Sequence, residues 1–238
     1  MHRTASVAMA AYNGELFIAE QIDSILERLE EQDELVISYD ESSDSTLEII
    51  RRYCSEDHRV KLVQNLNPGI VGNFNNALAA CRNDIIFISD QDDLWVGDKR
   101  NVMVEALASS GADLAIHNVV HIDEGGKIIS QPLFEEYGIG LGKLRNFAMP
   151  RYSGCCMAFP RDTMRIIHPM PLSVINYDHW IGMACEIFGH IQFVNEVLLH
   201  HRLHGANATT QRRPLALIAQ QRSHLLRELA KRHKELVR

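Results

Sequence analysis

The segment IIFISDQDDLW, residues 85–95, sets the first question about the fold. Five residues suited to a buried strand run directly into Asp90, Gln91, Asp92 and Asp93. Because like charges repel, three carboxylates in one small region are costly unless a cation, or a group that needs an acid, lies beside them. The alternative that this segment alone leaves open is an acidic turn without a ligand.

Strand and helix patterns alternate in the first half of the chain. Short apolar runs predict buried strands, and apolar residues at helical spacing predict helices between them. The predicted strands are 6–11, 34–40, 60–65 and 85–89, and the predicted helices are 18–31, 44–53 and 72–80. This order is typical of an α/β fold with a doubly wound, mostly parallel sheet and helices on both faces. Such sheets bind ligands beyond the carboxyl ends of their strands, where Tyr12, Asp40 and Asp90 are expected.

The second half of the chain is less regular. Its patterns predict helices at 98–109 and 178–188, strands at 114–122, 153–159 and 192–204, and a hairpin through Gly125 and Gly126 back to 127–130. The sequence contains neither an evident linker nor a repeat. We therefore expect one domain over 1–210, with a nucleotide-binding half at 1–95 and an acceptor half at 96–210, followed by a basic helix at 211–238.

Charge is unevenly distributed along the 238 residues, whose formal net charge is −7. Residues 211–238 hold eight Lys or Arg and two Glu, a local balance of +6, so the rest of the chain is acidic. A basic tail on an acidic body suggests a polyanionic surface as partner. Packing of this helix on the body and docking of it on a membrane surface both fit the pattern. The apolar residues near one face of the helix are Leu215, Ile218, Leu225 or Leu226, Leu229 and Leu236.

Cysteine usage and hydropathy point to a cytoplasmic protein. The five cysteines form no CxxC pair, and their odd number argues against a disulfide framework. Cys155 and Cys156 alternate on a predicted strand, and we interpret both as packing residues. No apolar run is long enough to predict a transmembrane helix, and the first residues do not have the pattern of a signal peptide.

Glycine motifs that cradle phosphates are absent, since the chain has neither GxGxxG nor GxxxxGK[ST]. A divalent cation would then have to neutralise bound phosphates, and carboxylates at a strand end suit Mg²⁺ or Mn²⁺. Asp40 could accept a hydrogen bond from a base, whereas Asp44 favours a helix cap. Tyr12 and Asn13 fit either a turn or the wall of a base site.

Two later motifs offer a general base and a further metal ligand. Asp178 in NYDHW is the best candidate for the base, although an aspartate at a helix start is more often a cap. His179 and Trp180 suggest the wall of a site, and Trp180 also suits the core. His204 in HHRLHGAN could supply an imidazole nitrogen to Mn²⁺.

Seven segments of the chain, taken in order, resemble glycosyltransferase family 2, and within it the bacterial rhamnosyltransferase-like enzymes of cell-surface polysaccharide synthesis. The resemblance covers about residues 5–210, and the serial order is more specific than any one segment. It implies a GT-A fold, a nucleotide-diphospho-sugar donor, a glycan or lipid-linked saccharide acceptor, Mn²⁺ or Mg²⁺, and inversion at the anomeric carbon. The segments are AAYNGELFIAEQIDSIL, VISYDESSDSTLEII, NPGIVGNFNNAL, IIFISDQDDLW, SGCCMAF, YDHW and HRLHGAN.

The resemblance also implies roles for individual residues. Asp178 would be the catalytic base, and Asp92 would ligate the metal together with His204. His179 and Trp180 would lie on the acceptor side. The donor would be bound by Ala11, Tyr12, Asn13, Glu15, Asp40, Asn73, Asp90 and Gln91.

Two segments depart from the family pattern. Ser38-Tyr39-Asp40-Glu41-Ser42 stands where Ser-Asp-Asp-Gly-Ser is usual, so one acid and a turn glycine are missing beside Asp40. The segment YDHW stands where a doubled tryptophan is common. These departures concern the base contacts and the acceptor pocket respectively.

Two other functions are alternatives at this point. A sugar nucleotidyltransferase would use the same nucleotide and metal, but it would need a basic, glycine-rich loop where this chain has Tyr12-Asn13-Gly14-Glu15. A non-catalytic binding module on the same fold could dispense with Asp92 and Asp178, and both are present. We therefore expect a metal-dependent glycosyltransferase, cytoplasmic or peripheral at the inner face of the membrane, without a nucleic-acid partner.

Overall fold

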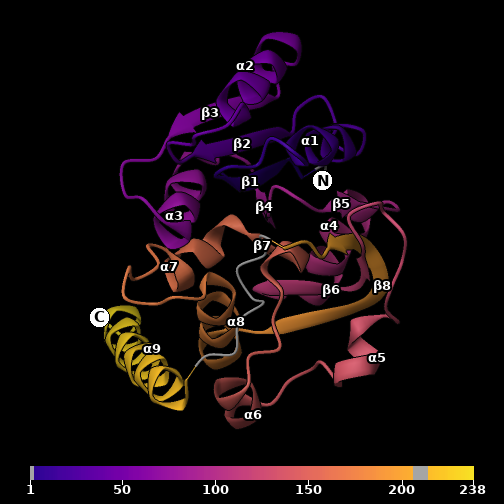
Figure 1. The fold of residues 1–238 in the computed structure, drawn as a ribbon. Coiled ribbons are helices and arrows are strands. Elements are labelled where there is room, and N and C mark those ends of the chain that lie inside the picture. Colours follow the sequence, from indigo (N-terminus) through magenta and orange to yellow (C-terminus); the bar gives the residue numbers. More distant parts are fainter. Residues whose placement is uncertain (1–2, 206–213) are drawn as a thin grey trace.

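A computed structural model describes residues 3–205 and 214–238. The strands are β1 (Ala5–Ala11), β2 (Glu34–Tyr39), β3 (Val60–Gln64), β4 (Ile85–Ser89), β5 (Leu94–Trp95), β6 (Leu114–Ile122), β7 (Met157–Pro160) and β8 (Ile191–Arg202). They form one curled, mostly parallel sheet in the order β3-β2-β1-β4-β7-β6-β8-β5 (Figure 1). The predicted α/β class with a mostly parallel sheet is confirmed.

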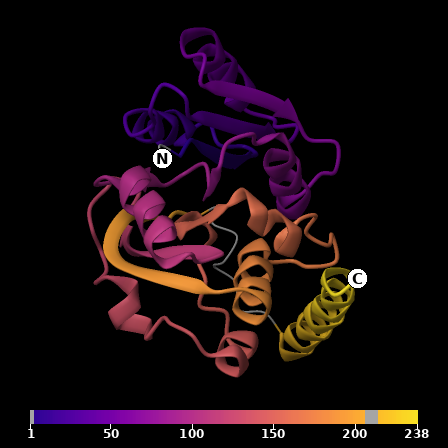
Figure 2. The ribbon, with the colours of Figure 1, turned by 180° about the vertical axis from the view of Figure 1, so that it is seen from behind.

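Nine α-helices surround this sheet within the described ranges. They are α1 (Ile18–Leu26), α2 (Thr46–Glu56), α3 (Ile70–Ala80), α4 (Lys99–Ser110), α5 (Leu133–Tyr137), α6 (Lys143–Ala148), α7 (Met164–Ile167), α8 (Tyr177–Phe188) and α9 (Leu215–Leu236). Seen from behind, α4 lies over the second half of the sheet, where it contacts β6, β7 and β8 (Figure 2). Every residue of β2 and β4 is buried, and because alternate side chains of a strand point to opposite faces, both faces of the sheet are covered there.

The parallel half of the sheet fixes where its strands end. β1 pairs in parallel with β2 and with β4, so that Ala11 lies beside Tyr39 and Met9 lies beside Ser89. The residues that follow these strands therefore emerge at one edge of the sheet. The sheet continues into the second half of the chain through antiparallel pairing of β4 with β7. The boundary predicted at residue 95 stays a prediction.

One local prediction in the second half is wrong. Residues 153–159 are not one strand, because Gly154–Cys156 form a 3₁₀ turn and both Cys155 and Cys156 are buried. The Tyr177 ring lies so close to Gly154 that an added Cβ would meet it at 2.2 Å, a tertiary contact that alternation along the chain does not predict. The hairpin predicted through Gly126 is present in a short form, with an antiparallel bridge between Ile122 and Ile128 and backbone hydrogen bonds from the Asp123 N–H to the Lys127 carbonyl (3.0 Å) and from the Ile129 N–H to the His121 carbonyl (2.9 Å).

The C-terminal helix α9 packs on the body, against α7 and α8. Leu225 and Leu229 are buried there, so this part of the predicted apolar face packs on the body. Arg232 donates hydrogen bonds to the carbonyl oxygens of Ile166 (2.9 Å), His168 (3.0 Å) and Pro169 (2.7 Å), and so caps the end of α7. The start of the predicted tail and the last two residues of HRLHGAN lie outside the described residues. Within the described ranges, no helix has the length and hydropathy to span a bilayer.

Candidate functional site

Polar side chains follow three parallel strands at the same edge of the sheet. Tyr12 comes directly after β1, Asp40 after β2 and Asp90 after β4. Parallel pairing brings these three strand ends together, which is the position where open α/β sheets bind ligands. The strand-end convergence predicted from sequence is therefore present.

Gln91 joins the ends of β1 and β4. Its amide accepts a hydrogen bond from the backbone N–H of Tyr12 at 2.9 Å and donates one to the Tyr12 carbonyl at 2.8 Å. A Cβ on Gly14 would lie 2.3 Å from the Gln91 Oε1, so glycine is required for this approach. Gln91 thus holds the loop after β1, while the Tyr12 side chain remains 56% exposed and accessible to a ligand.

Asn13 and Glu15 tie the same loop to the start of α2. Asn13 has a positive φ of 46°, a conformation that asparagine tolerates better than most residues, and its Oδ1 accepts from the Ser43 N–H at 2.9 Å. Glu15 accepts from the Ser45 N–H at 3.0 Å. Asn13 and Glu15, two of the predicted donor-binding residues, therefore fix the loop after β1 to the start of α2.

Asp40 is buried, and both of its carboxylate oxygens accept hydrogen bonds. Asn65 Nδ2 donates to Oδ1 at 2.5 Å, and the Gly69 N–H donates to Oδ2 at 2.9 Å. Asn73 donates to the carbonyl of the buried Ala11 at 3.1 Å, while its own Oδ1 is buried without a hydrogen-bond partner in the described structure. These contacts join β1, β2 and α3 behind the loop that holds Tyr12.

The two predicted metal ligands meet although 112 positions separate them. His204 Nε2 lies 2.8 Å from Asp92 Oδ2, and the exposed fractions of these side chains are 12% and 18%. The His204 ring also packs against Phe17, with ring centroids 5.0 Å apart. The chain therefore places a carboxylate and an imidazole at one point of the sheet edge.

Tyr177 connects the acidic segment to α8. Its hydroxyl lies 2.9 Å and 3.0 Å from the two oxygens of Asp90. Asp178 follows directly in the first turn of α8, which begins at Tyr177. Asp178 Oδ1 also accepts from the His179 N–H at 2.6 Å, a contact typical of a residue at a helix start.

A fully buried layer lies beneath these residues and contains Asp93, the third carboxylate of the acidic segment, and Lys99, for which the sequence predicted no role. Asp93 is 1% exposed and accepts from the Arg202 N–H at 3.1 Å. Lys99 is also fully buried, donates to the Cys155 carbonyl at 2.8 Å, and lies 4.3 Å from the centroid of the Trp95 ring. A lysine four residues after a core tryptophan is only a weak signal, and Cys155 comes from a segment 56 residues away.

Burial and mutual repulsion oppose ionisation of these acids. Burial, followed by the neighbouring charges of Asp93 and Asp92, raises the pKa of Asp90 to about 8. Burial and then Asp92 raise the pKa of Asp93 to about 7. Burial also lowers the pKa of Lys99 to about 8, which leaves this lysine mostly charged at pH 7 and able to offset part of the repulsion among the acids.

The carboxylate and imidazole donors of this region fit a hard divalent cation, whereas the Cys155 thiol is a soft ligand that such ions do not favour. Asp92 and His204 present an oxygen and a nitrogen together, and one ligand atom each of Asp90, Asp93 and Cys155 lies within 4.8 Å of the others. Carboxylate oxygens with one imidazole suit Mn²⁺, and oxygens alone suit Mg²⁺. A bound cation would offset the repulsion that raises the pKa values of the acids.

His179 and Trp180 point into the interior rather than toward the sheet edge. His179 is 3% exposed, donates from Nε2 to the Asn146 carbonyl at 3.0 Å, and has its Nδ1 3.3 Å from Arg222. Trp180 is fully buried and donates to the Ile167 carbonyl at 2.7 Å. Both residues have packing contacts in this structure, and their role toward an acceptor stays a prediction.

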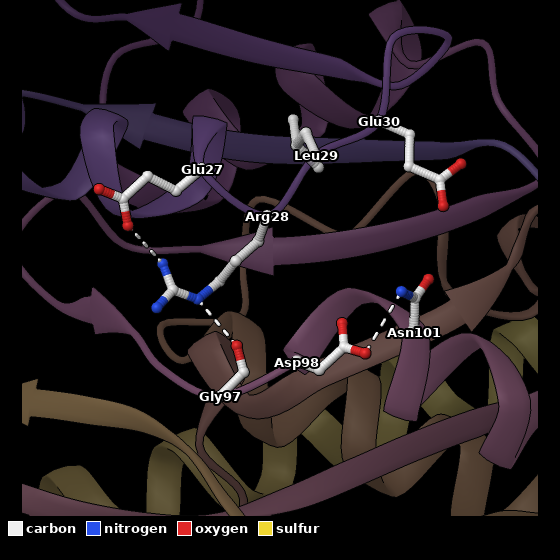
Figure 3. A pocket seen from close by; sticks show the side chains of 7 residues that line it. All are labelled: Glu27, Arg28, Leu29, Glu30, Gly97, Asp98 and Asn101. Atoms are coloured by element: carbon white, nitrogen blue, oxygen red, sulfur yellow. Dashed lines mark hydrogen bonds and ion pairs between the residues drawn. The ribbon is translucent and has the colours of Figure 1, made fainter.

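Two surface hollows lie away from these residues. The first, of about 500 Å³, is lined by Glu27, Arg28, Leu29, Glu30, Gly97, Asp98 and Asn101, and Arg28 reaches across it to Gly97 (Figure 3). It adjoins the C-terminal end of α1, whereas the site adjoins the N-terminal end of that helix. The second, of about 360 Å³, lies between the start of α6 and the start of β8. Neither contains a predicted site residue.

Solved structures similar to this chain confirm the GT-A fold. The S. aureus protein TarS, residues 1–349 in complex with UDP-GlcNAc, matches with a TM-score of 0.69 over 98% of this chain and 72% of that one, at 17% identity. The same TarS fragment in complex with UDP matches with a TM-score of 0.67 over 84% of this chain and 60% of that one, at 18% identity. At this level of identity the likeness establishes the fold alone.

Curated relatives are glycosyltransferases. An uncharacterized glycosyltransferase of Nostoc sp. is 27% identical over 85% of this chain and 65% of its own length. The dTDP-rhamnosyl transferase RfbG of Shigella flexneri is 32% identical over 50% of this chain and 43% of its own length. This chain thus spans at most about two thirds of these relatives. The model of "Glycosyl transferase family 2" matches residues 6–166, and the chain belongs to that family.

Proposed function

We propose that this protein transfers a sugar from a nucleotide-diphospho-sugar to a glycan or lipid-linked saccharide acceptor, with inversion and with Mn²⁺ or Mg²⁺. The observation that carries the proposal is the meeting of three distant segments. Asp92 contacts His204, and Tyr177, the neighbour of Asp178, contacts Asp90. These contacts support a site in which Asp92 and His204 would bind a cation and Asp178 would act as the base.

Asp92 and His204 would hold the metal, and Asp90 and Gln91 would lie near the ribose and the sugar. When bound, the metal supplies neutralisation of the diphosphate leaving group as the bond to the sugar breaks. The accessible Tyr12 ring and the loop around it would receive the base. Ala11, Asn13, Glu15, Asp40 and Asn73 would fix the shape of that donor pocket.

Asp178 would accept the proton of the acceptor hydroxyl. The acceptor oxygen would then attack the anomeric carbon from the face opposite to the leaving group, which gives inversion in a single displacement. Such general-base assistance is worth about 10²–10⁴ in rate. The start of α8, fixed to Asp90 through Tyr177, would set the position of this carboxylate.

The identity of the sugar and the setting are finer parts of the proposal. Similarity to RfbG supports rhamnose as the donor sugar and cell-surface polysaccharide as the product. TarS, whose complexes contain UDP and UDP-GlcNAc, supports a nucleotide-sugar donor of some kind. We place the enzyme on the cytoplasmic side, where activated sugars and a lipid-linked acceptor would meet, in peripheral contact with the membrane.

The test is nucleotide release from a panel of dTDP-rhamnose, UDP-sugars and GDP-mannose, with Mn²⁺ or with EDTA. Asp178→Asn is compared with Asp162→Asn, a control at an exposed aspartate on the 3₁₀ turn Arg161–Thr163. We expect metal-dependent release with one nucleotide, lost in the first variant and kept in the control. Release of pyrophosphate from a nucleoside triphosphate and a sugar 1-phosphate, assayed in parallel, would instead indicate a nucleotidyltransferase, and binding of no donor would indicate a partner module.

A further inference from the structure

The surface around α6 carries apolar side chains that the described residues do not cover. Leu144 is 88% exposed, Leu141 is 60% exposed and Met149 is 56% exposed. Single exposed leucines are ordinary, but three large apolar side chains within nine residues on a short helix and its flanks form a patch. A patch of this kind marks an interaction surface.

The charge of this segment is opposite to that of the chain. Residues 138–151 contain no Asp or Glu, but they contain Lys143, Arg145 and Arg151, in a chain of net charge −7. Lys143 and Arg145 are exposed beside Leu144. Apolar side chains flanked by cations are typical of a surface that lies on anionic lipid headgroups.

The patch continues onto α9. Arg222 donates to the carbonyl of Ala148, the last residue of α6, at 3.3 Å, which connects the N-terminal half of α9 to the end of α6. Leu226, one turn after Arg222, is 60% exposed. We call this surface the α6 face and define it as Leu141, Lys143, Leu144, Arg145, Met149 and Leu226. It is distinct from the buried residues by which α9 packs on the body.

The α6 face adjoins the helix that carries the candidate base. His179 Nε2 donates to the carbonyl of Asn146 in α6 at 3.0 Å, and Asp178 precedes His179. A bilayer in contact with α6 would therefore lie beside the first turn of α8. This arrangement would bring an acceptor anchored in that bilayer close to the site.

We propose that the α6 face docks on an anionic lipid bilayer. Leu141, Leu144 and Met149 enter the headgroup region, and Lys143 and Arg145 contact lipid phosphates. The proposal that this surface docks depends on its exposure and charge alone. Its benefit for a lipid-linked acceptor rests on the proposed function. The partner is a lipid surface rather than a second copy of the chain, because a second copy would bring the same cations face to face.

The experiment is flotation of the full chain with vesicles of phosphatidylcholine alone or of phosphatidylcholine and phosphatidylglycerol in equal amounts. We expect binding to the anionic vesicles only, weakened by added salt. Leu144→Asp should weaken it about tenfold or more, and Lys143→Ala about fivefold. Leu66→Asp is the matched control, since Leu66 is 83% exposed on the loop between β3 and α3, far from α6 (Figure 1).

Three outcomes would overturn the proposal. The first is no binding to anionic vesicles, and the second is binding that Leu144→Asp leaves unchanged. The third is self-association of the chain that Leu144→Asp abolishes, without any binding to vesicles. The last outcome would make the α6 face a contact between copies. Nucleotide release from a soluble donor is measured in parallel and should be the same in Leu144→Asp as in the unmodified chain. If neither the unmodified chain nor Leu144→Asp releases nucleotide, the proposed function is rejected, and the vesicle experiment alone decides this inference.

Discussion

Carboxylates at two strand ends of one sheet edge have opposite environments. After β2, both oxygens of Asp40 accept hydrogen bonds, from Asn65 and from Gly69. After β4, Asp90 lies with Asp92 and Asp93, and burial and their charges raise its pKa to about 8. Aspartates at equivalent positions after two strands therefore have different roles. The first is satisfied within the fold, and the second belongs to a group of like charges suited to a cation.

The largest expected effect concerns the cluster. Asp92→Asn removes one of the two groups that would hold the metal, and metal stabilisation of a leaving group is worth several kcal/mol, so transfer should fall on the order of 10²–10³-fold. The same change removes a like charge from beside Asp90 and Asp93. The melting temperature should therefore stay the same or rise. Turnover with Mn²⁺ and thermal unfolding of the same preparation check both parts, and a fall in both would show that Asp92 is structural.

The next effect tests a buried polar group whose partners are all within the protein. Burial, followed by the charge of Arg222, lowers the pKa of His179 to about 4 from its ordinary value of 6.5. The unfolded chain therefore takes up the proton first as the pH falls. Stability from this histidine is complete above about 6.5 and is lost toward about 4, with a total of about 3 kcal/mol.

Denaturant unfolding of the unmodified chain and of His179→Gln at pH 7 and at pH 5 measures this slope. The loss of unfolding free energy over this interval should be smaller in the variant. The same loss in both proteins would show that His179 is protonated at its ordinary pKa in the fold.

A smaller effect is expected for the satisfied carboxylate. In Asp40→Asn, one amide N–H₂ must face either the amide of Asn65 or the N–H of Gly69, so one hydrogen bond is replaced by two opposed donors. We expect a loss of about 2 kcal/mol in the free energy of unfolding, measured with urea. A variant as stable as the unmodified chain would remove the contrast between Asp40 and the cluster.

The smallest effect concerns the connection between β1 and β4. Gln91→Ala deletes two hydrogen bonds to the backbone of Tyr12, and because these bonds are exposed we expect a loss of about 1 kcal/mol. Hydrogen exchange at the Tyr12 amide should become faster, while amides of β2 keep their protection. Faster exchange throughout the sheet would mean that Gln91 supports the whole fold rather than this loop.

The same comparison separates the features that the sequence could predict from those that it could not. The alternation of strands and helices up to Ser89 is local, and the parallel order and the strand-end edge follow from it. The contact between Asp92 and His204 is not local, and it was expected only because the segments resemble a known family. The contact of Tyr177 with Asp90 and the burial of Lys99 had no comparable signal, since each depends on packing between elements far apart in the chain.

The irregular second half shows the same limit. The segment 153–159 alternates like a strand, yet Gly154–Cys156 form a 3₁₀ turn, and the ring of Tyr177 lies where a side chain at position 154 would be. The tail was open to two interpretations, and burial of Leu225 and Leu229 shows that one side of its helix packs on the body. An apolar face predicts that a helix packs against a partner, but it does not show which surface that partner is.

The most direct test of the account is calorimetric titration of Mn²⁺ into the protein with a nucleoside diphosphate present. The unmodified chain and Asp40→Asn should both bind Mn²⁺ saturably. Asp92→Asn should bind it at least about tenfold more weakly, since loss of even an outer partner of a metal ligand costs 10–100-fold. Equal affinity in Asp92→Asn and the unmodified chain would contradict the assignment of the acidic cluster as the metal site.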